Sequence, residues 1–261
     1  MVNKLGQKKT VPLYLSWAKS KVGRILKRLF HLKFYHKKSG ADFTKLIRDN
    51  LQRIELITLK DFCEKFNIFV DRTAIKIPYP PKIPPSGMLV MFNSEIKTLC
   101  AIARGIKAKN ILEIGTFEGE TAANIAYNID DNSKIYTLDF YPYQLFSGIK
   151  AGKYIKEDPR AEKLTEMINA DSLNFDFAPF YEKIDMVFID GGKTYECTAS
   201  DSENAFKCLR EGGFIIWHDF INIHTEVVSA IFDFVKKRNL KLYLIDGTRM
   251  AITPKTTLPA R

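Results

Sequence analysis

The stretch Ile111-Leu-Glu-Ile-Gly-Thr-Phe-Glu-Gly119 decides the fold of this chain. It opens with apolar residues that predict a buried strand, and it leads into a segment, 120–129, whose apolar residues recur at helical spacing. Between strand and helix, Gly115 and Gly119 allow a tight turn and a close approach of the backbone to a ligand. Because the free N–H groups at a helix start attract anions, this arrangement favours a ligand-binding turn over a merely structural one.

Strands and helices alternate on both sides of this stretch. The pattern predicts strands at 110–114, 134–139, 166–170, 184–189, 214–217, 241–245 and 249–253, and helices at 93–106, 120–129, 196–208 and 225–237, with a polar, partly helical connection at 144–164. Such alternation implies a parallel sheet covered by helices on both faces. We therefore predict a Rossmann-like α/β fold with a seven-stranded, mostly parallel sheet. Its last strand must be antiparallel, because only Asp246-Gly-Thr248 separates it from the strand before.

The first 90 residues have a different character. A helical region is predicted at 41–66, and the proline-rich segment 75–87 excludes regular helix and central strand. We therefore divide the chain into a basic arm at 1–40, a helical extension and proline-rich linker at 41–90, and an α/β domain at 91–261.

The net charge of +10 comes entirely from the arm. Residues 1–40 contain eleven Lys or Arg and no Asp or Glu, which leaves 29 basic and 30 acidic residues for 41–261. Within the arm, residues 13–32 have apolar residues on one helical face and Lys and Arg on the other. This helix can lie on an anionic membrane surface, or its apolar face can pack on the domain, and the sequence leaves both interpretations open.

Composition predicts a cytoplasmic protein, with membrane attachment through the arm as an option. A hydrophobic content of 46% and a charged content of 27% are typical of a globular protein, and no apolar run approaches the roughly 20 residues of a membrane span. The four cysteines have neither metal-ligand spacing nor the density of a disulfide scaffold, so we expect reduced thiols.

Open α/β sheets bind ligands at the carboxyl ends of their strands, so the residues that follow each strand are candidates. In this chain they are Glu113 to Gly119, Asp139, Asp171-Ser172, Asp190 and His218-Asp219. Thr121, in the first turn of the helix after the glycines, offers a further hydroxyl donor.

The pattern Glu113-x-Gly115-x-x-x-Gly119 resembles motif I of class I S-adenosylmethionine-dependent methyltransferases. The resemblance implies that the ligand is S-adenosylmethionine, that Asp139 binds the ribose hydroxyls, and that the loop with Asp171 and Ser172 holds the adenine. The segment Phe188-Ile-Asp-Gly-Gly192 is similar to motif IV of the same family. The cofactor-binding residues implied are Glu113, Gly115, Thr116, Phe117, Gly119, Thr121, Asp139, Asp171, Ser172 and Asp190.

The segments 188–196 and 211–219 more closely resemble the small-molecule O-methyltransferases, the catechol-type or methyltransferase-24-like branch. The resemblance implies that Asp190 and Asp219 bind a divalent cation such as Mg²⁺ and that Lys193 is the general base. A cation beside the acceptor hydroxyl lowers its pKa, and a base then takes the proton during attack on the methyl group. Phe220 departs from the family, because it stands where the family has a third ligand, an asparagine.

Several alternatives stay open at this stage. His218 is a second candidate for the base, and either residue can instead be structural, Lys193 as a solvated lysine and His218 as a hydrogen-bonded wall residue. The expected acceptor is a hydroxyl of a small molecule or of a glycan or lipid-linked intermediate. The competing functions are a non-catalytic protein on the same fold, a nucleotide-binding oxidoreductase and a nucleic-acid methyltransferase that uses the arm. The absence of a G-x-G-x-x-G turn disfavours the oxidoreductase, and the lack of net positive charge in 41–261 disfavours nucleic acid.

Overall fold

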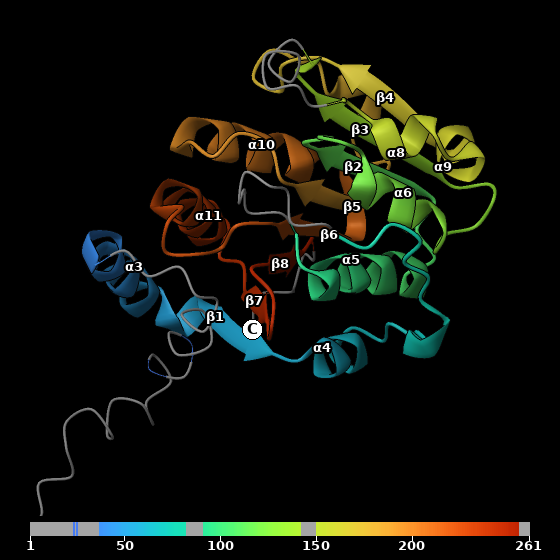
Figure 1. Cartoon of the computed structure of the whole chain (residues 1–261). Coiled ribbons are helices and arrows are strands. Elements are labelled where there is room, and N and C mark those ends of the chain that lie inside the picture. The colour runs from blue at the N-terminus through green and yellow to red at the C-terminus, as the bar shows by residue number, and fades with distance from the viewer. Residues whose placement is uncertain (1–22, 24, 26–36, 82–90, 142–149, 256–261) are drawn as a thin grey trace, which may run out of the picture.

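The computed structural model describes residues 23, 25, 37–81, 91–141 and 150–255, and one mixed sheet runs through them (Figure 1). The sheet has eight strands in the order β1-β7-β8-β6-β5-β2-β3-β4. The strands are β1 (Ile54–Ile57), β2 (Asn110–Ile114), β3 (Lys134–Asp139), β4 (Thr165–Asn169), β5 (Ile184–Ile189), β6 (Leu209–Trp217), β7 (Leu242–Ile245) and β8 (Ala251–Pro254).

The predicted strand directions are confirmed. Neighbouring strands are parallel except at β8, which is antiparallel to both β6 and β7. The carboxyl ends of the other seven strands therefore lie at one edge of the sheet, where the candidate residues were expected.

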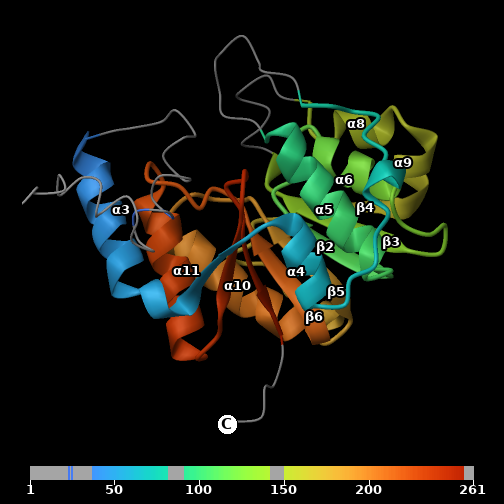
Figure 2. The same ribbon diagram turned by 90° about the horizontal axis from the view of Figure 1, so that it is seen from below.

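Helices cover both faces of the sheet (Figure 2). They are α3 (Lys37–Asp49), α4 (Leu59–Lys65), α5 (Asn93–Gly105), α6 (Glu120–Ala126), α8 (Lys153–Lys156), α9 (Pro159–Leu164), α10 (Tyr195–Cys208) and α11 (Thr225–Lys237), with short 3-10 helices at Leu51–Arg53, Arg72–Ala74 and Ala178–Phe180. The predicted helices of the α/β domain are all present, and their ends differ from the predicted ends by at most three residues.

Two apolar cores result from the alternation of side chains along the strands. In β5, Met186 and Phe188 join the core under α4, α5 and α6, whereas Val187 and Ile189 join the core under α3, α10 and α11. Burial on both faces explains why β5 is apolar at every position except Asp185. The side chain of Asp185 is buried, and it accepts hydrogen bonds from the backbone N–H groups of Lys109 and Asn110.

The predicted helix at 41–66 is wrong in its middle. The chain there forms α3, a 3-10 turn, β1 and α4, and β1 pairs in parallel with β7. This additional strand makes the sheet eight-stranded instead of seven-stranded. It also extends the sheet to residues before the predicted domain boundary at 91.

Most of the predicted arm lies outside the described residues. Of its helix, the structure describes Gly23 and Ile25, which are both helical. Ile25 is 1% exposed and belongs to the core that includes Phe43 and Ile47 of α3, which favours packing of the apolar face on the domain. None of the described helices is long and apolar enough to cross a membrane.

Candidate active site

The loop between β2 and α6 is held against the end of β5. Gly115 has a φ of +105°, and a Cβ atom at this position would lie 2.5 Å from the carbonyl oxygen of Asp190. The N–H of Asp190 in turn donates to the carbonyl of Ile114 at 2.8 Å. Only glycine allows both this φ and this approach. The glycine turn therefore brings the predicted cofactor loop into contact with the predicted catalytic loop.

Asp139 fixes the same loop from the neighbouring strand. One of its carboxylate oxygens accepts hydrogen bonds from the N–H groups of Thr116 at 2.8 Å and Phe117 at 2.9 Å, and the other accepts from the N–H of Phe140 at 2.7 Å. Asp139 therefore holds the loop after β2 at the end of β3.

Glu113 lies beneath the loop and is 1% exposed. It accepts a hydrogen bond from the hydroxyl of Thr137, which also hydrogen-bonds with the hydroxyl of Thr116 at 2.8 Å. Burial raises the pKa of Glu113 to about 8, because the hydrogen bond from Thr137 only partly offsets it and the charges of Asp190 and Asp139 add to it. Glu113 is therefore mostly protonated at neutral pH and supports the loop as a neutral group.

The other predicted cofactor residues lie at the same edge with different partners. Asp171 accepts hydrogen bonds from the N–H of Leu173 at 3.0 Å and from the side chain of Asn174 at 2.9 Å, so it shapes the turn after β4. Ser172 lies in the same turn, beside the buried carboxyl group of Asp201. The hydroxyl of Thr121 donates to the sulfur of Met91 at 3.3 Å, so in this arrangement it is directed toward the start of α5.

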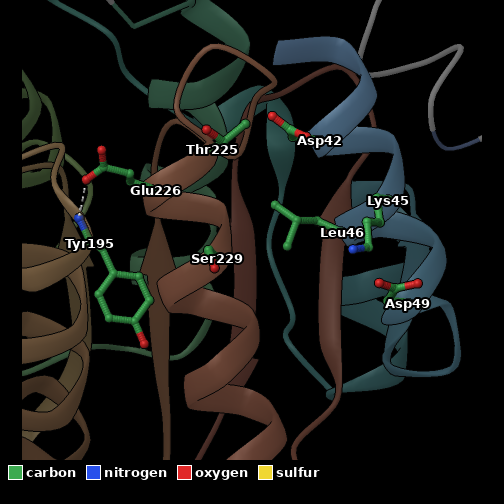
Figure 3. A pocket seen from close by; sticks show the side chains of 8 residues that line it. All are labelled: Asp42, Lys45, Leu46, Asp49, Tyr195, Thr225, Glu226 and Ser229. Carbon is green, nitrogen blue, oxygen red and sulfur yellow. Dashed lines mark hydrogen bonds between the residues drawn. The ribbon is translucent and has the colours of Figure 1, made fainter. Parts of the chain in front are cut away.

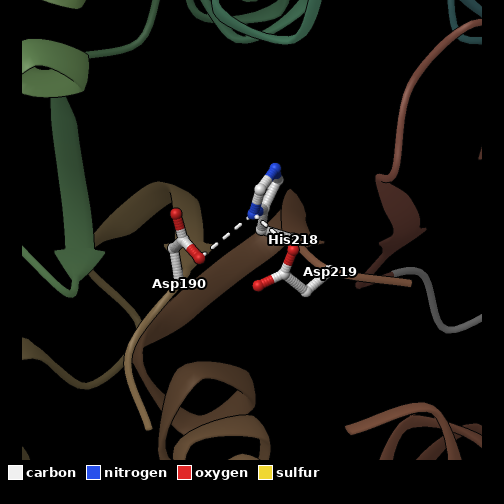
Figure 4. A group of neighbouring side chains, drawn as sticks. All are labelled: Asp190, His218 and Asp219. Carbon is white, nitrogen blue, oxygen red and sulfur yellow. Dashed lines mark hydrogen bonds and ion pairs between the residues drawn. The ribbon is translucent and has the colours of Figure 1, made fainter. Parts of the chain in front are cut away.

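At the ends of β5 and β6, Asp190, His218 and Asp219 converge (Figure 4). The Nδ1 atom of His218 lies 3.1 Å from an oxygen of Asp190 and 3.3 Å from an oxygen of Asp219. His218 is 4% exposed and Asp219 is 6% exposed. Asp219 has a φ of +54°, an uncommon and strained conformation for a residue with a side chain.

Lys193 connects the two carboxylates. Its Nζ atom forms an ion pair with Asp190 and lies 3.0 Å from an oxygen of Asp219. Burial alone would lower the pKa of Lys193, but the two carboxylates outweigh it and hold this pKa above its ordinary value. Lys193 is therefore an ammonium ion in this arrangement, whereas a general base needs a lowered pKa.

Two residues that the sequence did not single out complete the network. Glu95 of α5 accepts from Arg249 Nε at 3.0 Å and from Arg249 Nη2 at 2.7 Å, and both side chains are fully buried. The oxygen of Glu95 that accepts from Nη2 also lies 3.1 Å from Nε2 of His218 and accepts from the backbone N–H of Phe92 at 2.6 Å. Glu95 therefore fixes the orientation of the His218 ring and leaves Nδ1 facing the two aspartates.

The charges of this cluster determine how its members titrate. Burial would lower the pKa of His218, but Asp190 and Asp219 hold it well above its ordinary value. Conversely, burial would raise the pKa of Asp219, but the charge and hydrogen bond of His218 keep it well below its ordinary value. His224, 3.7 Å from Asp219, is a further neighbour that the sequence did not indicate, and burial lowers its pKa.

The donor set suits a divalent cation. One ligand atom each from Asp190, His218 and Asp219 lie within 4.8 Å of one another, and Oδ1 of the buried Asp219 faces Nδ1 of His218 at 3.3 Å and Nη1 of Arg249 at 3.5 Å. Two carboxylates and an imidazole are a common ligand set for divalent metals. The ammonium group of Lys193 occupies a position between the carboxylates, so a cation must compete with it.

Residues 112–220 match the family model described as a methyltransferase domain. This chain carries a methyltransferase domain. The match spans the loop after β2, Asp139, and the whole segment from Asp190 to Phe220. A search of curated proteins found no match.

Solved structures of O-methyltransferases have a fold similar to that of this chain. The O-methyltransferase TomG from Streptomyces achromogenes is 14% identical, with a TM-score of 0.52 over 89% of this chain and 96% of that one. A putative caffeoyl-CoA O-methyltransferase from Staphylococcus aureus is 18% identical, with a TM-score of 0.50 over 82% of this chain and 99% of that one. The predicted Rossmann-like methyltransferase fold is thus confirmed.

Phe220 has a packing role in this methyltransferase domain. It is fully buried, and its ring packs against those of Phe43 and Phe232 with centroids 6.2 Å and 5.5 Å away. The position that the resemblance assigns to a third metal ligand is therefore part of the core under α3 and α11. Within the described residues, His218 is the third side chain that could offer a ligand atom.

Two cavities lie outside the cluster. One, of about 430 Å³, is lined by α3, α11 and Tyr195, and contains none of the predicted site residues (Figure 3). The second, of about 600 Å³, lies between α4, α5 and the turn that joins β7 to β8.

Proposed function

We propose that this methyltransferase domain transfers a methyl group from S-adenosylmethionine to a hydroxyl group of a small molecule or of a glycan or lipid-linked intermediate. The observation that best supports this function is the contact between Gly115 and Asp190, which joins the proposed cofactor loop to the charged cluster. The structure of TomG, which shares the fold, is a complex with S-adenosylmethionine. Methyl transfer requires the methyl group and the acceptor at adjoining places, and the loop after β2 and the charged cluster lie side by side at this edge of the sheet.

The residues around the β2–α6 loop would hold the cofactor. Asp139, at the end of β3, would accept from a vicinal diol such as the ribose hydroxyls, and the loop with Asp171 would border the adenine. The full set proposed is Glu113, Gly115, Thr116, Phe117, Gly119, Thr121, Asp139, Asp171, Ser172 and Asp190.

Asp190, Asp219 and His218 would hold a divalent cation such as Mg²⁺, which lowers the pKa of an acceptor hydroxyl. His218 can be a ligand only as a neutral ring, with its proton on the nitrogen that faces Glu95. The carboxylate of Glu95 favours that tautomer and holds the ring in place.

In the reaction, the acceptor oxygen attacks the methyl carbon, the bond from this carbon to sulfur breaks, and the hydroxyl proton moves to a base. Lys193 is the proposed base, because it is partly exposed and its Nζ atom reaches both carboxylates. It can accept the proton only where another positive charge balances the carboxylates that hold its pKa high. His218 is the alternative base, but its two ring nitrogens already face carboxylates within the wall.

Two measurements test this function. Titration calorimetry with S-adenosylmethionine should give binding, and an acceptor screen should detect release of S-adenosylhomocysteine. The Asp190→Asn and Lys193→Met variants should lose most transfer, with a larger effect on transfer than on cofactor affinity. Absence of cofactor binding would contradict the whole proposal, whereas full transfer by the two variants would contradict only the roles of Asp190 and Lys193.

A further inference from the structure

The cavity of about 600 Å³ lies at the same edge of the sheet as the charged cluster. Its walls come from Thr58, which follows β1, the start of α4, the segment 72–75, α5 between Ser94 and Ala101, and the turn that joins β7 to β8. Cavities of roughly 300 to 1,000 Å³ hold small organic ligands. This one has an apolar part formed by Leu59, Ile75, Ala101 and Ile245.

The ionic groups that line this cavity are mostly positive. They are Lys60, Arg72 and Lys97, against the single carboxylate of Asp246. Lys60 forms a weak, exposed ion pair with Glu64 at 3.6 Å. Within the described ranges, Arg72 and Lys97 have no acidic side chain within ion-pairing distance, and both are exposed. Two cations at one cavity without counter-ions attract an anion.

The hydroxyl groups that line the cavity already donate their hydrogens to other atoms of the protein. All five donate their hydrogens inside the protein, two to aspartate side chains and three to backbone carbonyls. A neutral sugar or polyol would therefore find few donors here, and the remaining strong donors are charged. The hydroxyl residues are Thr58, Thr73, Ser94, Thr98 and Thr248.

The cavity adjoins the buried network behind the cluster. Ser94 and Thr248 line it, and the next residue in each case, Glu95 and Arg249, belongs to the ion pair that supports His218. Ser94 also donates to the carbonyl of Gly247 at 3.1 Å, which ties α5 to the turn. A ligand in the cavity would therefore lie against the outer side of that ion pair.

We propose that this cavity binds an organic molecule through an anionic group, a phosphate or a carboxylate, held by Arg72 and Lys97. The apolar part of the cavity contacts the carbon skeleton of the same molecule. The anion belongs either to the methyl acceptor or to a separate small molecule, and the first assignment rests on the proposed function.

Binding of inorganic pyrophosphate to the full chain tests the site without methyl transfer. Calorimetry at low salt should give a dissociation constant that rises with ionic strength. The double variant Arg72→Gln/Lys97→Gln should bind roughly tenfold more weakly, as expected for the loss of two exposed charged contacts. The control variant Lys163→Gln/Lys236→Gln removes the same charge from α9 and α11, outside the cavity, and should keep the wild-type affinity.

No pyrophosphate binding by the wild type, or equal losses in both double variants, would overturn the site. Acceptors found in the screen then distinguish the two sources. If the anion is part of the acceptor, Arg72→Gln/Lys97→Gln raises its KM and leaves the affinity for S-adenosylmethionine unchanged. If the anion is a separate molecule, that KM stays constant while pyrophosphate binding is still lost. Failure of the screen itself leaves the binding result intact, so the two proposals fail separately.

Discussion

Replacing Glu95 with glutamine tests the buried ion pairs that support His218. Glutamine keeps the shape of the side chain but removes its charge, which leaves the buried guanidinium of Arg249 with the longer contact to Asp219, at 3.5 Å, in place of its close ion pair. Both side chains are fully buried, so solvent does not screen the loss. We expect Glu95→Gln to fold to the same structure with a lower free energy of unfolding.

The size of the loss follows from the pKa of Glu95. Burial alone would raise it, but the hydrogen bonds and charges of His218 and Arg249 lower it from 4.5 to about 2. At about 1.4 kcal/mol for each pKa unit, this difference contributes roughly 3 kcal/mol to stability at pH 7. Because the pKa is lower in the folded state, the contribution is complete above pH 4.5 and decreases as the pH falls toward 2. At pH 3 it should be about 1 kcal/mol.

Urea unfolding followed by circular dichroism at pH 7 and pH 3 measures this difference. Other groups titrate in both proteins, so the difference between wild type and Glu95→Gln isolates the effect of this carboxylate. The control Glu64→Gln removes an exposed charge and should cost less than about 0.5 kcal/mol. A loss at pH 7 no larger than that of the control, or a loss that stays the same at pH 3, would refute the argument.

Three further outcomes are expected. Gly115→Ala should lower stability by roughly 2 kcal/mol or more, because its Cβ would meet Asp190; Gly212→Ala also has positive φ but no atom within 4 Å, so a smaller loss in thermal unfolding is expected, and equal losses would refute the contact. Asp139→Asn should weaken S-adenosylmethionine binding roughly tenfold in calorimetry, and unchanged affinity would exclude the proposed diol contact. Mn²⁺ should raise the melting temperature of the wild type but not of Asp219→Asn, and equal shifts would place the cation elsewhere.

Most strands of the α/β domain could be predicted because they are short, largely apolar segments bounded by polar or glycine residues. The strand β1 could not, for a geometric reason. Ile54 and Ile57 are three residues apart, which places them on one face of a helix but on opposite faces of a strand. In the structure they join the two different cores. Only pairing with β7, nearly 190 residues later, distinguishes the two conformations.

Some residues of the candidate site could likewise be predicted from the sequence, and others could not. Asp139, Asp190 and Asp219 follow strands, so the rule about carboxyl ends was sufficient to place them together. Glu95 and Arg249 belong to a helix and a turn that reach this edge only through tertiary packing. One signal was available: Glu95 stands among the apolar residues of α5, where an unpaired carboxylate would be costly, and such a residue implies a buried partner.

The identity of the base depends on charge balance more than on distance. Three carboxylates, Glu95, Asp190 and Asp219, are matched by three basic side chains, His218, Lys193 and Arg249. The carboxylates hold the pKa of Lys193 and that of His218 above their ordinary values, so both groups keep their protons. Neither is therefore a base while the charges are balanced in this way. A cation held by Asp190 and Asp219 would offset these negative charges and lower the pKa of both Lys193 and His218, whereas Arg249 would keep its proton. Of the two, Lys193 is the partly exposed side chain, which is why we propose it as the base.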